Sequence, residues 1–189
     1  MPRGIAKDHD AKRAALRKGA ARYFAQNGFD RASMTGAAHS CGISKALIYH
    51  YYDSKEALLV DILDAHLSEL VATVETTSGQ GMEPLIAAIL VAYEDAAPEH
   101  RLQLDALHTL PPDQKAPLRD MQKRLVSVMM DEINATRPGL PPDRLRAAAM
   151  TVFSILNWFY VWHRPGKGLS RGDYAALAAE FVQGGLDRI

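Results

Sequence analysis

The sequence predicts an all-α protein of nine helices arranged in two domains. Apolar residues recur every three or four positions through most of the 189 residues, and alternating runs of β-branched residues are nearly absent. Lysine plus arginine and aspartate plus glutamate balance at 22 each, yet residues 1–55 carry ten basic and four acidic side chains, a net charge of +6, which leaves −6 on the rest. A basic segment ahead of an acidic body predicts two functions in one chain.

Caps and stops predict the first four helices. Apolar residues at every fourth position predict a first helix that stops at Gly28. Ser33 and Ser44 are suited to cap two short helices, and Asp53 or Ser54 is suited to cap a long one. These helices are expected over residues 10–27, 33–40, 44–51 and 53–77.

Prolines and a serine cap separate the five later helices. Pro98 is expected to end the first of them, and the Pro111–Pro112 pair ends the next. Pro117 suits the first turn of the third, because the N–H that proline lacks has no partner there. Ser170 with Asp173 resembles a capping box that opens the last helix. The five are expected over residues 84–97, 101–110, 117–135, 143–163 and 170–189.

Composition excludes several classes of protein. Cys41 is the only cysteine, which excludes an intrachain disulfide and a cysteine-based zinc cluster. A single cysteine fits a reducing, cytoplasmic setting. The longest charge-free apolar stretch, residues 147–162, is shorter than the roughly 20 residues that a membrane span needs, so we expect no membrane span. The histidines lack metal-ligand spacing, and no nucleophile elbow is present. We therefore expect no metal, no cofactor and no enzymatic activity.

Residues 33–52 carry the strongest motif, which is a helix, a glycine turn and a second helix. Gly42 supplies the positive φ that a tight turn between helices needs. In a helix-turn-helix, the start of the second helix enters the major groove of DNA. Here that start is the segment Ser44–Leu47, in which Lys45 can reach a guanine edge or a phosphate and the apolar side chains can meet a thymine methyl.

Several short patterns surround this motif between residues 13 and 59. They are Ala20-Ala21 followed by Phe24, Asn27-Gly28-Phe29, Gly42-Ile43-Ser44-Lys45, Ile48-Tyr49-His50-Tyr51-Tyr52 and Ser54-Lys55-Glu56-x-Leu58. Together they resemble the TetR family of bacterial transcription regulators. The resemblance implies that Tyr49 and Lys55 contact phosphates, that His50 and Tyr51 face the DNA backbone or the groove, and that Tyr52 packs inside the DNA-binding domain. The candidate DNA-binding residues are Ser33, Thr35, Ser44, Lys45, Ala46, Leu47, Tyr49, His50, Tyr51 and Lys55.

Three positions depart from the family pattern. Ala37 stands where a large aliphatic residue is usual, and Leu47 stands where small or polar residues are common. Gly36 replaces an acidic or polar residue inside the first short helix, where glycine costs about 0.5–1 kcal/mol relative to alanine.

The resemblance implies a TetR-like division of the chain. Residues 9–56 form the helix-turn-helix DNA-binding domain, and residues 57–189 form a domain that binds a ligand and dimerises through its last two helices. The composition of these two helices supports dimerisation, because the helix over 143–163 is too apolar for an exposed helix and the last helix has an apolar face. A homodimer places two DNA-binding domains on the half-sites of a palindrome.

A weaker resemblance covers residues 102–186. Leu110-Pro111-Pro112, Asn157-Trp158, the loop of residues 164–170 and Gly185-Leu186 are similar to TetR regulators that sense acyl-CoA thioesters, such as those of fatty-acid, sterol-ring and phenylacetate catabolism. Lys123 and Arg124 are candidate partners for CoA phosphates, together with two arginines of the effector set. That effector set is Leu63, His66, Tyr93, Arg101, Leu107, His108, Arg119, Met121, Leu125 and Trp158.

The sequence thus predicts a ligand-responsive regulator that binds double-stranded DNA. We expect a repressor that a small hydrophobic or acyl-CoA effector releases from a palindromic operator. The alternative is a small helical ligand carrier or enzyme without specific DNA binding, which a gel-shift assay would distinguish.

Overall fold

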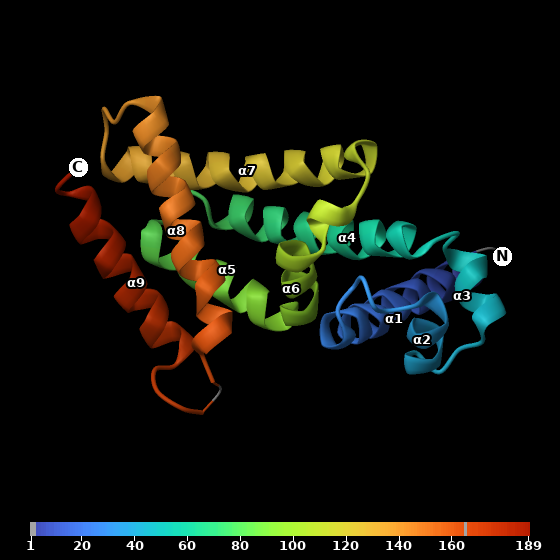
Figure 1. The fold of residues 1–189 in the computed structure, drawn as a ribbon. Helices are drawn as coiled ribbons and strands as arrows, with labels where there is room; N and C mark the ends of the chain where they lie inside the picture. Colours follow the sequence, from blue (N-terminus) through green and yellow to red (C-terminus); the bar gives the residue numbers. More distant parts are fainter. Residues whose placement is uncertain (1–2, 165) are drawn as a thin grey trace. The chain divides into compact units, whose positions relative to one another are not determined.

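The computed structural model describes residues 3–164 and 166–189, and these contain nine α-helices and one short 3₁₀ helix (Figure 1). Their only extended pairing is an isolated bridge between Arg164 and Lys167. The predicted all-α fold class is therefore confirmed. The helices are α1 (Arg3–Asn27), α2 (Met34–Ser40), α3 (Lys45–Tyr51), α4 (Lys55–Thr77), α5 (Met82–Asp95), α6 (Ala97–Asp105), η1 (Leu107–Thr109), α7 (Pro112–Thr136), α8 (Pro142–Trp162) and α9 (Arg171–Leu186).

The chain divides into two compact units. The first unit runs to His66 and includes Ala96–Leu118, and the second unit comprises Leu67–Asp95 and Arg119–Ile189. Two of the three boundaries fall within helices, one in α4 and one in α7, and the third falls between α5 and α6. The predicted functional boundary at residue 56 stays a prediction.

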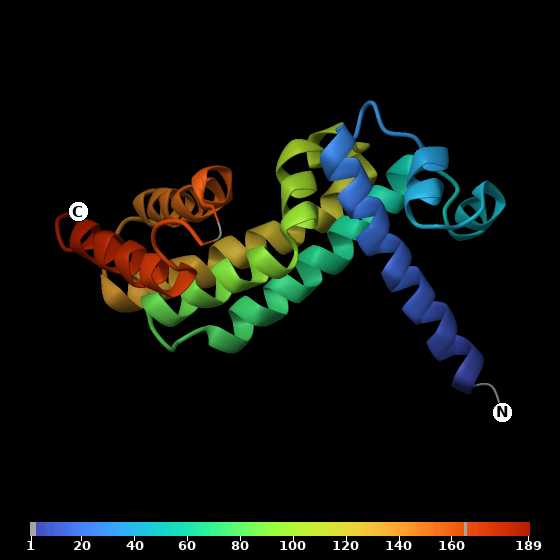
Figure 2. The same cartoon turned by 90° about the horizontal axis from the view of Figure 1, so that it is seen from below.

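In the first unit, α1 packs against both α2 and α6, and α2 packs against α3 (Figure 2). The core is apolar, as the periodicity requires. Phe24 of α1, Ile48 of α3 and Leu58 and Leu59 of α4 are completely buried. Their removal from water stabilises each helix by about 1.5–3 kcal/mol per side chain. This core holds the two short helices, which are too short to be stable alone in water.

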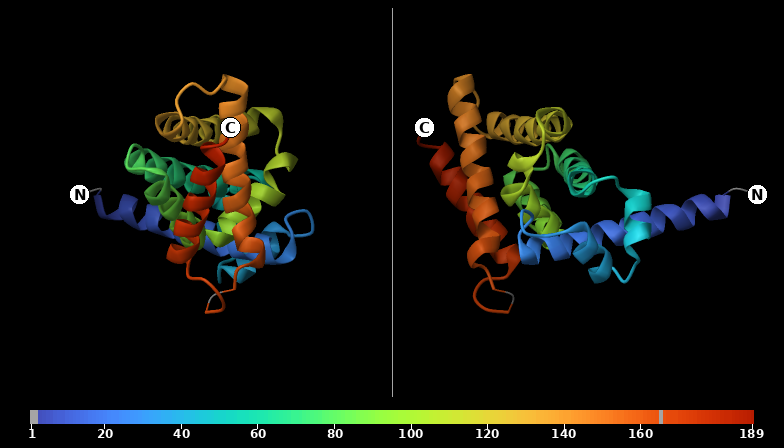
Figure 3. Two further views of the ribbon diagram at one scale, coloured as in Figure 1. Left: turned by 90° about the vertical axis from the view of Figure 1, so that its left-hand side faces the viewer. Right: turned by 45° about the vertical axis from the view of Figure 1, so that its right-hand side comes forward.

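In the second unit, α5 packs against both α8 and α9 (Figure 3). The buried face of α5 consists of Met82, Leu85, Ile86, Ile89, Leu90 and Tyr93. Glu132 of α7 is also buried, and its carboxylate accepts a hydrogen bond of 2.9 Å from the backbone N–H of Gly79. Among the described helices, none is long and apolar enough to cross a membrane.

Two proline predictions were wrong. The helix expected to start at Pro117 begins at Pro112, and Pro117 lies inside it. Pro112 offers the same missing N–H five residues earlier, so it takes the first position and lengthens the helix. Pro98 was expected to end a helix at residue 97, but it lies in the first turn of α6, because α5 already ends at Asp95.

Candidate nucleic-acid interface

Serine caps and a glycine turn form the helix-turn-helix as predicted. The Ser33 Oγ accepts from the N–H of Gly36 at 3.1 Å, and the Ser44 Oγ accepts from the N–H of Leu47 at 3.1 Å. Between the helices, the N–H of Ile43 donates to Ala38 O, and the N–H of Gly42 donates to His39 O, each at 3.0 Å. With Gly42 at φ 67°, these two bonds form a Schellman motif, which only a residue tolerant of positive φ can close without strain. The turn angle is therefore set by local chemistry.

The packing of α2 against α1 explains why position 36 is a glycine. A Cβ built on Gly36 of α2 would overlap the hydroxyl of Tyr23 of α1. A similar close approach occurs at Gly19, where a Cβ would lie 2.6 Å from the Sγ of Cys41. The departure from the family pattern at Gly36 thus allows α1 and α2 to approach closely, and this gain offsets the weak helix propensity of glycine.

The structure exposes most of the predicted DNA-binding side chains. Leu47 is 41% exposed and Tyr49 is 44% exposed, although both are large and apolar or aromatic. Lys45 lies with its Nζ 5.9 Å from the centre of the Tyr49 ring, one turn along α3. Tyr51 is half-buried, and its ring centre lies 5.0 Å from that of His9. The exposed members are Ser33, Thr35, Ser44, Lys45, Ala46, Leu47, Tyr49 and His50.

Lys55 at the start of α4 is half-buried and already hydrogen-bonded within the protein. Its Nζ donates to the backbone carbonyls of Phe29 at 2.8 Å, Ala32 at 3.2 Å and Asp30 at 3.4 Å, and it lies 4.4 Å from the centre of the Phe29 ring. The ammonium therefore closes the loop between α1 and α2. Its expected contact with a phosphate stays a prediction, and sequence reasoning missed this internal role.

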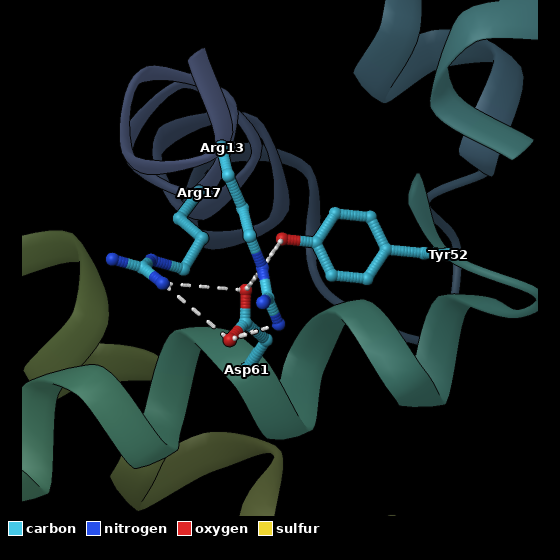
Figure 4. Close-up of polar contacts among 4 residues, drawn as sticks. All are labelled: Arg13, Arg17, Tyr52 and Asp61. Carbon is cyan, nitrogen blue, oxygen red and sulfur yellow. Dashed lines mark hydrogen bonds and ion pairs between the residues drawn. The ribbon is translucent and has the colours of Figure 1, made fainter. Parts of the chain in front are cut away.

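Sequence reasoning also missed a polar network that joins α1, the end of α3 and α4 (Figure 4). The Asp61 carboxylate accepts from the Tyr52 hydroxyl and from two nitrogens of Arg13, at 3.0 and 2.8 Å. It also forms an ion pair with Arg17 at 3.4 Å. Burial and the hydrogen bond to Asp61 raise the pKa of Tyr52 to about 12, so the phenol stays protonated at neutral pH. No local signal could have found this network, because Arg13 and Asp61 are 48 positions apart.

The predicted effector residues divide between the two units. Leu63, His66, Arg101, Leu107 and His108 belong to the first unit, and Tyr93, Arg119, Met121, Leu125 and Trp158 belong to the second. Leu63, His66, Tyr93 and Leu125 are buried, Leu107 and Met121 are half-buried, and Arg101, His108, Arg119 and Trp158 are exposed.

Two buried histidines stand out in the first unit. The rings of His66 of α4 and His100 of α6 lie 5.9 Å apart, and the two residues are 4% and 1% exposed. Burial lowers the pKa of His66 to about 4, and neighbouring Gln103 partly opposes this shift. Burial and the adjacent His66 lower the pKa of His100 to about 3. Both imidazoles are therefore neutral at pH 7.

Three of the four candidate CoA-phosphate cations form exposed ion pairs. Arg101 pairs with Asp105 at 3.3 Å, Lys123 with Asp120 at 2.7 Å, and Arg124 with Glu75 at 2.5 Å. Such pairs are worth at most about 1 kcal/mol, so a phosphate can compete for the cations. Within the described part of the chain, no cluster of histidine, cysteine or acidic residues is arranged to hold a metal ion.

A capped helix-turn-helix that exposes the first turn of its second helix is typical of DNA-binding proteins. Residues 16–62 match the family described as "Bacterial regulatory proteins, tetR family", and residues 75–186 match "Tetracyclin repressor-like, C-terminal domain". The chain belongs to the TetR family and is a ligand-responsive, DNA-binding transcriptional regulator.

Individual relatives and solved structures agree with this assignment. The chain is 23% identical to the transcriptional activator FasR of Mycolicibacterium smegmatis over 194 residues, which cover 99% of this chain and 88% of FasR. It is 27% identical to a TetR-family regulator from Bordetella parapertussis, with a TM-score of 0.82 over 90% of this chain and 93% of that one. A structure of AibR in complex with isovaleryl coenzyme A and operator DNA has the same fold, with a TM-score of 0.77 at 20% identity over 90% of this chain and 97% of AibR.

Proposed function

We propose that this regulator is a repressor that binds a palindromic operator as a homodimer and leaves it when a hydrophobic or acyl-CoA effector binds. The exposed first turn of α3, held by the Ser44 cap and the Gly42 turn, carries the proposal. A recognition helix must present its first residues to the base edges, and Lys45, Ala46 and Leu47 are exposed here.

We infer a division of labour along α3. Lys45, Ala46 and Leu47 at its start face the base edges, where the ammonium reads a guanine and the apolar groups meet thymine methyls. Tyr49 and His50, one turn further on, contact the phosphate backbone and set the register. Changes at the first group therefore alter the preferred sequence, whereas changes at the second weaken binding to all sequences.

The exposed apolar side chains of α8 and α9 support dimerisation through these helices. Trp158 and Trp162 of α8 are 64% and 48% exposed and lie one turn apart on the same face. Leu177 and Phe181 of α9 are 50% and 73% exposed at the same spacing. A soluble monomer rarely leaves four large apolar side chains in water at such regular spacing, so a second copy of the chain is the expected cover.

The effector proposal rests on the buried residues among the candidates. Leu63 and His66, both buried in the first unit, are side chains of the kind that surrounds a hydrophobic or aromatic acyl group. The ion-paired cations described above are available for CoA phosphates. The acyl-CoA bound to AibR supports this class of ligand for a protein of the same fold.

We infer that release follows a shift in population. An effector that binds better to a conformation unsuited to DNA lowers operator affinity by the ratio of its affinities for the two states. The helix α4 contributes residues to both units and is the proposed relay. A repressor of this kind acts on chromosomal DNA, so we place it in the cytoplasm.

Two experiments test these proposals. Selection of binding sites from a random duplex library should return a palindrome, whereas selected sites without two-fold symmetry would refute the palindromic operator. Thermal shift against a panel of acyl-CoA thioesters should find at least one that raises Tm, because a ligand at a hundred times its Kd adds about 2.7 kcal/mol. If no thioester raises Tm, the acyl-CoA effector is refuted. A reporter gene placed behind the selected site distinguishes repression from activation.

A further inference from the structure

The recognition helix is attached to α4 at its carboxyl end. Tyr52 directly follows α3, caps it through a backbone N–H bond of 3.0 Å to Ile48 O, and is 5% exposed. Its hydroxyl reaches Asp61, nearly two turns into α4. Tyr52, the last residue of the helix-turn-helix, therefore links the end of α3 directly to α4.

The Asp61 carboxylate accepts hydrogen bonds from Tyr52, Arg13 and Arg17. Arg13 of α1 donates from Nε to one oxygen of Asp61 and from Nη2 to the other, which is the two-pronged geometry that fixes a guanidinium in both distance and orientation (Figure 4). Arg17, one turn along α1, adds a longer contact at 3.4 Å. The Asp61 side chain is only 14% exposed, so these bonds are less screened than those of a surface pair.

The negative charge and the burial of Asp61 indicate that it affects DNA binding by positioning other residues and not by contacting DNA. A carboxylate repels phosphates, and the Asp61 side chain is largely covered by the two arginines and Tyr52. Tyr52 is buried, so its hydroxyl is not available to DNA either. Yet both residues hold the recognition helix against the two longer helices of the first unit.

We propose that Asp61 is a positioning residue for DNA recognition: through Tyr52 it holds α3 at the angle to α1 and α4 at which its first turn reads base edges. This inference rests on the proposed operator binding and adds the residues that transmit a shift of α4 to the recognition helix. The Arg13–Asp61–Tyr52 contact, called the clamp below, is the physical link.

The clamp predicts a loss of specificity with little change in bulk electrostatic attraction. Tyr52→Phe keeps the buried ring and removes one hydrogen bond to a charged group, which is worth about tenfold in an equilibrium constant. We expect operator affinity to fall about tenfold and affinity for a scrambled duplex of the same length to stay unchanged. The slope of log K against log salt stays unchanged too, because no phosphate contact is lost.

The experiment measures these quantities by fluorescence anisotropy on the full chain, with the operator selected from a random library by the wild-type protein. The variants are Tyr52→Phe, Asp61→Asn and the double variant. Tyr23→Phe is the matched control, because it removes a hydroxyl from a half-buried tyrosine of α1 outside the clamp. Far-ultraviolet circular dichroism at the assay temperature verifies that each variant is folded.

The double variant gives the decisive comparison. If Tyr52 and Asp61 act through the same bond, the double variant loses no more affinity than Asp61→Asn alone. Additive losses, or an unchanged ratio of operator to scrambled-duplex affinity in both single variants, would overturn the clamp while leaving operator binding intact. A wild-type protein that selects no sequence would instead overturn the proposed function and the clamp with it.

Discussion

Acidification from pH 8 to pH 5 is expected to destabilise the protein through His66 and His100. Both imidazoles are buried in the first unit and neutral when folded, with pKa values lowered by burial to about 4 and about 3. In the unfolded chain both are in water with a pKa of about 6.5. Between pH 6.5 and pH 4 the unfolded state therefore binds protons that the folded state does not, and stability falls as pH falls.

The magnitude follows from the two pKa values of each histidine. At pH 5 the pH is about 1.5 units below the pKa of the imidazole in the unfolded chain, so that imidazole is almost wholly protonated. The imidazole in the folded chain is still almost wholly neutral. Each histidine then removes about 2 kcal/mol of unfolding free energy, and the two together remove about 4 kcal/mol. A domain of this size has about 5–15 kcal/mol in total, so the effect is large enough to measure directly.

The assay is urea unfolding followed by circular dichroism at pH 8, 7, 6 and 5, at one fixed protein concentration because dimerisation contributes to stability. His66→Leu removes one titrating group, so its loss of stability between pH 8 and pH 5 should be about 2 kcal/mol smaller than that of the wild type. Comparing each variant with itself at two pH values cancels the effect of the substitution on packing. His39→Leu, on the exposed surface of α2, is the control for removing a histidine outside the buried pair. If His66→Leu and the wild type lose the same stability, the buried neutral histidine is refuted as the cause.

Three further predictions concern single contacts. Gly36→Ala should lower the unfolding free energy by about 1–3 kcal/mol in urea unfolding, because its methyl meets the Tyr23 hydroxyl. The same substitution should cost less when it is made in a Tyr23→Ala background. Equal stability of Gly36→Ala and wild type would show that α1 and α2 do not need this approach. Lys55→Ala should destabilise by about 1–3 kcal/mol in urea unfolding through the loss of its carbonyl contacts, and if it also contacts a phosphate the salt slope of DNA binding should fall by about one; an unchanged slope leaves only the structural role. Trp158→Glu with Phe181→Glu should give a monomer in analytical ultracentrifugation with weaker operator binding, and a variant that stays dimeric would place the interface elsewhere.

Interactions between near neighbours in the chain could be predicted well. Ser33 and Ser44 each cap the N–H three residues ahead, and Gly42 closes a turn whose donors and acceptors lie within five residues. Such contacts depend on residue type and spacing alone, which is why the helix-turn-helix was read correctly. The start of α7 was misread for the same reason, because Pro112 and Pro117 have the same chemistry and nothing local chooses between them.

The candidate site was predicted only where exposure follows from helix periodicity. The exposed face of α3 was expected and is present. The internal role of Lys55 was not, because it depends on carbonyls in a loop more than twenty positions earlier in the chain. The need for glycine at position 36 could not be predicted either, because it depends on the Tyr23 side chain of another helix.

The helical fold, the helix-turn-helix motif and the division of charge could be predicted from residue order alone, since each depends on groups that are near one another in the chain. Which polar residues meet depends on how the helices pack. Asp61 looks like one surface acid among several along α4, and it becomes the junction of three elements only when Arg13, 48 positions away, lies beside it. The neutral state of His66 and His100 was decided in the same way, because the pKa of an imidazole depends on the packing that surrounds it and not on its position in the sequence.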